Sequence, residues 1–186
     1  MGLQLPLERR KRLIAVGVSA LAMGWMEAIV VVYIRKMIGL EGNLDAMDPG
    51  TQQAVLERFS LMRSQGPDGF VSPAFLWIEQ SREAATILML AAIAWLSGLN
   101  IRQRIAYFFF CFGLWDLVYY AALWLLLRWP PSLSTVDILF LIPQPWIANM
   151  WIPAALSCVF IAGSIWSLLV PGRSGAARKR RTRSRR

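Results

Sequence analysis

Four long apolar stretches, separated by more polar segments, set the pattern of this chain. A bilayer core is crossed by about 20 apolar residues in a helix, and the first stretch alone would extend about 33 Å. Pro171-Gly172 is a typical helix stop after the last stretch. The pattern predicts an all-α, polytopic membrane protein, a bundle of four transmembrane helices within one membrane domain (13–170), with spans at about 13–34, 73–98, 105–127 and 147–170.

The second stretch is the least regular of the four. Its apolar part, residues 84–96, is too short to cross a bilayer, so a spanning helix must also include Glu79, Arg82 and Glu83. A charge facing hydrocarbon costs about 2.5–3.5 kcal/mol on the insertion scale, so such residues usually face a bundle interior or a water-filled cavity.

Two connecting segments have patterns of their own. In the outer loop, 35–72, Asp48-Pro49 resembles a helix start, and residues 52–65 show helical apolar spacing. We expect a short amphipathic helix there, on the outer membrane surface or on the bundle. Residues 137–142 are apolar but too short to span, and predict either an interfacial helix or a shallow re-entrant turn before the last span.

The positive charge lies at the two ends of the chain. Residues 1–12 hold four basic residues and Glu8, the tail 171–186 holds eight basic residues and no acid, and the segment between them has eight basic and ten acidic residues. The positive-inside rule then places both termini in the cytoplasm, with the protein in the cell (inner) membrane. We expect the Arg-rich tail to be disordered and to contact anionic lipids; its composition alone resembles a nucleic-acid-binding segment, but nucleic acid is not the partner we expect.

A cleaved secretory signal is the alternative to a first span, because Ala20-Leu21-Ala22 resembles a cleavage site. The apolar stretch continues to Ile34, which favours a span.

The amino-acid composition limits the kinds of catalytic and metal-binding site that the chain can form. The chain of 186 residues is 56% hydrophobic and 17% charged, and it contains no histidine. The absence of histidine excludes Ser-His-Asp and Cys-His catalysis and the usual zinc and copper ligand sets. Cys111 and Cys158 lie in separate apolar stretches without metal-ligand spacing. No cofactor or metal is specified by these residues.

Polar residues fall at overlapping depths in the outer half of several spans, which predicts one outer-half pocket. We assign a direct role in proton transfer or catalysis to Glu27, Glu83, Asp116 and Tyr119, and a role in holding a substrate or ion to Glu79, Arg82, Tyr120, Asp137 and Asn149. The simpler interpretation is that Arg82 neutralises Glu79 or Glu83 at the interface and that the tyrosines are interfacial anchors.

Three functions fit these residues. The first is a small membrane protein that binds or relays protons or a hard cation through carboxylates. The second is a histidine-free enzyme using carboxylate acid–base chemistry on a lipid or isoprenoid-like substrate, with Arg82 holding an anionic head group. The third is an accessory subunit of a larger membrane complex, with Gly17, Ala20 and Gly24 allowing close packing on an exposed face.

Overall fold

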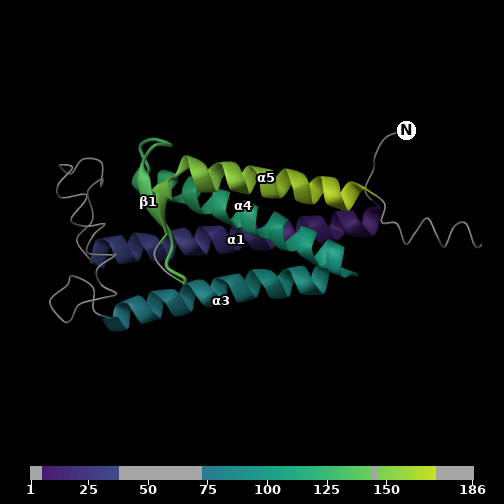
Figure 1. The fold of residues 1–186 in the computed structure, drawn as a ribbon, viewed down its shortest axis with the longest axis horizontal. Coiled ribbons are helices and arrows are strands. Elements are labelled where there is room, and N and C mark those ends of the chain that lie inside the picture. Colours follow the sequence, from purple (N-terminus) through teal and green to yellow (C-terminus); the bar gives the residue numbers. More distant parts are fainter. Residues whose placement is uncertain (1–5, 38–72, 144–145, 171–186) are drawn as a thin grey trace, which may run out of the picture.

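Four helices and one β-hairpin make up the computed structural model, which describes residues 6–37, 73–143 and 146–170. The elements are, in chain order, α1 (Leu7–Met37), α3 (Pro73–Ser97), α4 (Ile101–Leu127), β1 (Val136–Phe140), β2 (Trp146–Asn149) and α5 (Trp151–Leu169). The helices lie side by side and alternate in direction, so the start of α1 and the end of α5 are at the same end of the bundle (Figure 1). The predicted amphipathic helix at 52–65 lies outside the described residues.

Three of these helices, α1, α4 and α5, are long and apolar enough to cross a membrane. The protein is therefore a mostly helical, multi-pass membrane protein. The helix α3 has the length of a span but carries three charged residues in its first half, as the sequence indicated.

Polarity is distributed as in a membrane protein. Large apolar side chains such as Leu96, Leu88 and Trp166 are exposed on the outside of the bundle. Buried polar or charged residues lie inside it, among them Glu79, Glu83, Thr86, Asp116, Asp137 and Ser157. An apolar exterior of this extent needs lipid or protein against it.

The helix α4 is the centre of the bundle, because it packs against α1, α3 and α5. Two glycines allow neighbouring helices to pack closely against each other. A Cβ atom added at Gly24 of α1 would lie 2.6 Å from the Trp115 carbonyl oxygen of α4, and one added at Gly113 of α4 would lie 2.7 Å from the Ser157 carbonyl oxygen of α5.

The predicted exposed face of small residues in the first span is therefore wrong. Gly17, Ala20 and Gly24 are all buried, and the two glycines face side chains or backbone of α4. Their small size serves packing inside the chain and does not indicate a partner subunit.

The segment before the last helix is a hairpin, not the interfacial helix or simple re-entrant turn that we expected. β1 and β2 pair antiparallel, with Asp137 opposite Ala148. Val136 and Ile138 are β-branched residues that favour strands. The hairpin extends from the end of α4 and the start of α5 to α3 (Figure 1).

The last helix accordingly begins at Trp151, later than expected. Asn149 lies in β2, where its side-chain amide donates to the Ser134 carbonyl at 2.9 Å.

At the opposite end of the bundle, arginines cap the C-termini of two helices. Arg102 donates to the carbonyls of Ser167 and Val170 at the end of α5, and Arg9 donates to Leu168 of the same helix. Arg12 reaches the Ser97 carbonyl at the end of α3. Cations at a helix C-terminus donate to free carbonyl groups and interact favourably with the negative end of the helix dipole. These arginines therefore make this end of the fold basic.

Candidate functional site

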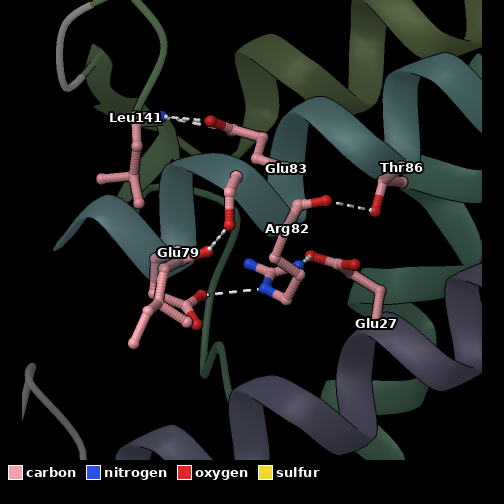
Figure 2. Close-up of polar contacts among 8 residues, drawn as sticks. Glu27, Glu79, Arg82, Glu83, Thr86 and Leu141 are labelled. Carbon is pink, nitrogen blue, oxygen red and sulfur yellow. Dashed lines mark hydrogen bonds and ion pairs between the residues drawn. The ribbon is translucent and has the colours of Figure 1, made fainter. Parts of the chain in front are cut away.

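Arg82 of α3 joins two helices by contacting two carboxylates. Its Nε donates to Glu79 Oε2 at 2.8 Å, and its Nη1 donates to Glu27 Oε1 of α1. All three side chains are mostly buried; Arg82 keeps 25% of its side chain exposed, Glu27 13% and Glu79 11%. Figure 2 shows the guanidinium between the two helices. One buried cation therefore holds two acids from different parts of the chain.

Glu83, one residue further along α3, holds the hairpin. Both of its carboxylate oxygens lie 3.0–3.1 Å from the Leu141 backbone nitrogen, which donates to them (Figure 2). Gln80, three residues earlier, donates from Nε2 to the Leu141 carbonyl at 3.1 Å. Two α3 side chains thus satisfy both backbone groups of one residue that follows β1. Buried backbone groups need such partners, since leaving one unpaired is costly.

An aromatic side chain next to this contact also holds the hairpin against the helices. Phe140, the last residue of β1, stacks on Phe112 of α4 with ring centroids 5.9 Å apart, and it lies 6.4 Å from the Trp115 ring. The hairpin is therefore held by polar contacts to α3 and by apolar contacts to α4.

A second buried ion pair lies where α1, α4 and β1 meet. Arg35 lies 3.9 Å from Asp137 and stacks over the Trp129 ring, 3.6 Å from its centroid. Tyr120 donates its hydroxyl to Asp137 Oδ2 at 3.2 Å. Asp137 lies outside the helical spans, and burial raises its pKa to about 6, against the opposing effect of Arg35.

Asp116 is part of neither ion pair. It is buried, and its Oδ2 accepts a hydrogen bond from the Ser157 hydroxyl of α5 at 2.7 Å. No arginine or lysine forms an ion pair with it within the described ranges.

The residues of the predicted pocket therefore form three neighbouring groups instead of one shared pocket. Glu27, Glu79 and Arg82 come together as expected, with Glu83 adjacent to them. Tyr120 and Asp137 come together, Asp116 pairs with Ser157, and Asn149 stands apart on the hairpin. The ring of Tyr119 packs edge-on against that of Tyr120, with ring centroids 4.9 Å apart.

Some partners were missed at the level of sequence. Arg35 stands at the start of the predicted loop 35–72, and nothing in the sequence marks Gln80 as a contact of the hairpin. Ser157 offered a signal, since it is a polar residue in an apolar stretch. The Leu141 backbone offered none, because its role depends on the hairpin.

Among the described residues, no three carboxylate or cysteine side chains are grouped so that they could hold a metal ion. Comparison with known proteins adds no assignment, as no protein-family model, curated protein or solved structure matches the chain.

The contact between Glu83 and Leu141 can be tested directly. Replacing Glu83 by Ala should speed hydrogen exchange of the Leu141 amide by about tenfold to a hundredfold, because an unsatisfied buried donor costs about 1–3 kcal/mol. The measurement is amide exchange of the protein in nanodiscs, read by mass spectrometry. Glu8→Ala, which removes an exposed acid paired with Lys11, is the control and should leave this amide unchanged. Equal protection of Leu141 in the Glu83 variant would contradict the contact.

Proposed function

We propose that the chain is a four-span protein of the cell membrane, with α3 as the fourth span and both termini in the cytoplasm. The support for α3 is its position. It runs alongside the three apolar helices (Figure 1), and its charged residues are largely buried in contacts with α1 and the hairpin. The support for the orientation is the arginine-rich end formed by α1, the α3–α4 turn and α5.

We further propose that the outer half of this bundle binds protons. The observation that carries this proposal is an imbalance of charge. Among the residues that the structure describes, five mostly buried carboxyl groups (Glu27, Glu79, Glu83, Asp116 and Asp137) are accompanied there by two buried or half-buried guanidinium groups (Arg35 and Arg82). Carboxylates in excess of cations are strongly disfavoured in a low-dielectric region, and a proton is the simplest way to neutralise them.

Glu83 and Asp116 are the residues we assign to proton binding. Glu27 and Glu79 are held by Arg82, whereas Glu83 and Asp116 form no ion pair with a described residue: Glu83 accepts from the hairpin backbone and Asp116 from a serine hydroxyl. A hard cation such as Ca²⁺ or Mg²⁺ is the alternative ligand. The proton is favoured over it because Arg82 already occupies the space between two acids and a metal would need several oxygen ligands.

The two other functions draw less support from the contacts. A lipid-modifying enzyme would use Arg82 to hold an anionic head group, but this guanidinium already donates to two carboxylates. An accessory subunit would present Glu27 or Asp116 to a partner, but both have partners inside the chain.

The crossing of α3 can be tested by cysteine labelling in intact cells. Lys36→Cys, at the end of α1, should react with a membrane-impermeant maleimide, whereas Leu99→Cys, after α3, should react only once the membrane is permeabilised. Both positions are exposed in the fold. Leu133→Cys, after α4, is the control and should behave like Lys36→Cys, in a background where Cys111 and Cys158 are replaced by Ser. Labelling of positions 36 and 99 from the same side would show that α3 does not cross.

Proton binding can be tested by infrared difference spectroscopy of the protein in nanodiscs as the pH is raised. We expect bands of protonated carboxyl groups to disappear with rising pH, and we expect Glu83→Gln and Asp116→Asn each to remove part of this signal. Glu8→Gln, at an exposed site, should not change it. If neither buried substitution alters the spectra, these residues do not bind protons; if added Mg²⁺ shifts the same bands at constant pH, the cation alternative is correct.

A further inference from the structure

A groove lies between α4 and α5 at the basic end of the bundle, away from the carboxylates. It encloses about 520 Å³ and is open on one side. This volume is within the range of about 300–1,000 Å³ that is typical of ligand sites. Both bordering helices are apolar enough to cross a membrane, so the opening faces the hydrocarbon of the leaflet at that end.

The lining changes from apolar to polar along the groove. Its deeper part is apolar and includes Ile105, Phe109, Val159 and Phe160, and its end toward the membrane surface carries Arg102, Ser164 and Ser167. Gly163 leaves room in the middle, because a Cβ atom added there would meet nothing within 4 Å. An elongated apolar groove that ends at a cation matches a molecule with an acyl chain and an anionic head.

The charge at the mouth of the groove is not neutralised by the described residues. Arg102 donates through Nε and Nη2 to the Ser167 hydroxyl and to two carbonyls, which are neutral acceptors. Arg9 and Arg12, at the same end, also donate to carbonyls, and none of the three pairs with a carboxylate there. The side-chain hydroxyl of Ser164, a buried residue, makes no hydrogen bond within the part of the chain that the structure describes.

We propose that this groove is a binding site for an anionic phospholipid of the leaflet at the basic end. One acyl chain lies along Ile105, Phe109 and Phe160. The phosphate accepts hydrogen bonds from Nη1 of Arg102, which has no acceptor among the described residues, and from a serine hydroxyl. Arginine is well suited to this, because its planar guanidinium offers several donors to phosphate oxygens.

The test uses the full chain in nanodiscs of phosphatidylcholine alone and in nanodiscs of equal parts phosphatidylcholine and phosphatidylglycerol. Bound lipid is counted by native mass spectrometry after release, and apparent affinity is obtained from titration with phosphatidylglycerol. The unmodified chain should retain phosphatidylglycerol in preference to phosphatidylcholine. Arg102→Gln should weaken this binding by about tenfold, the loss expected for a hydrogen bond to a charged group.

Two further variants separate the groove from general attraction to a basic surface. Gly163→Leu fills the open space without touching any charge, and it should abolish the preference for phosphatidylglycerol. Arg104→Gln removes a cation at the same end, one that stacks on Trp95 at 3.6 Å and does not line the groove, and it should leave the affinity nearly unchanged.

The proposal is overturned if Arg104→Gln weakens binding as much as Arg102→Gln, because the lipid would then respond only to surface charge. It is also overturned if Gly163→Leu retains full binding, or if that substitution instead dissociates a dimer of the unmodified chain, which would make a second copy the occupant. Should Arg102→Gln unfold because it caps α5, the Gly163 variant alone decides between these outcomes.

Discussion

The contact of Arg82 with Glu27 and Glu79 is the interaction on which the arrangement of α3 depends. Without it, Glu79 and Arg82 of α3 and Glu27 of α1 would be mostly buried without an ionic partner, at a cost of several kcal/mol per charge. With it, the helix presents a paired guanidinium to α1 and an apolar face to its surroundings. The polar residues that make α3 a poor span by composition are thus the residues that attach it to the bundle.

The same constraint explains the hairpin. Its backbone groups need hydrogen-bond partners wherever water is scarce. Pairing between β1 and β2 supplies most of them, and Gln80 and Glu83 supply those of Leu141. Phe140 meanwhile stacks on α4. The hairpin therefore closes the bundle at the end opposite the start of α1, and its attachment depends on the Glu83 carboxylate. The acidic residues thus make structural contacts in addition to forming the proposed proton sites.

Much of the architecture could be read from the chain, because lipid imposes a simple length and polarity requirement on each span. The bounds of α3 and α4 lie within about four residues of the predicted stretches, whereas α1 begins at Leu7, about six residues before the predicted first stretch. The hairpin could not be predicted, since a short apolar run between prolines fits a helix, a turn or a strand, and its choice depends on contacts with α3 and α4.

The polar residues of the bundle could be listed from the sequence, but most of the contacts between them could not. Depth along each helix brought Glu27, Glu79 and Arg82 to one level, as the structure has them. The remaining contacts depend on how each helix is rotated about its axis: Asp116 pairs with Ser157 of α5. This rotation cannot be read from one sequence whose helices are apolar nearly all round.

A double-mutant cycle between Glu27 and Arg82 tests the central claim most directly. The free energy of unfolding would be measured in bicelles for the unmodified chain, Glu27→Gln, Arg82→Gln and the double variant. The account predicts a coupling energy of about 1 kcal/mol or more, since the two side chains are in direct contact within the bundle. Effects that add to within about 0.3–0.5 kcal/mol would show that the two residues do not interact, and would contradict the attachment of α3 to α1 through this pair.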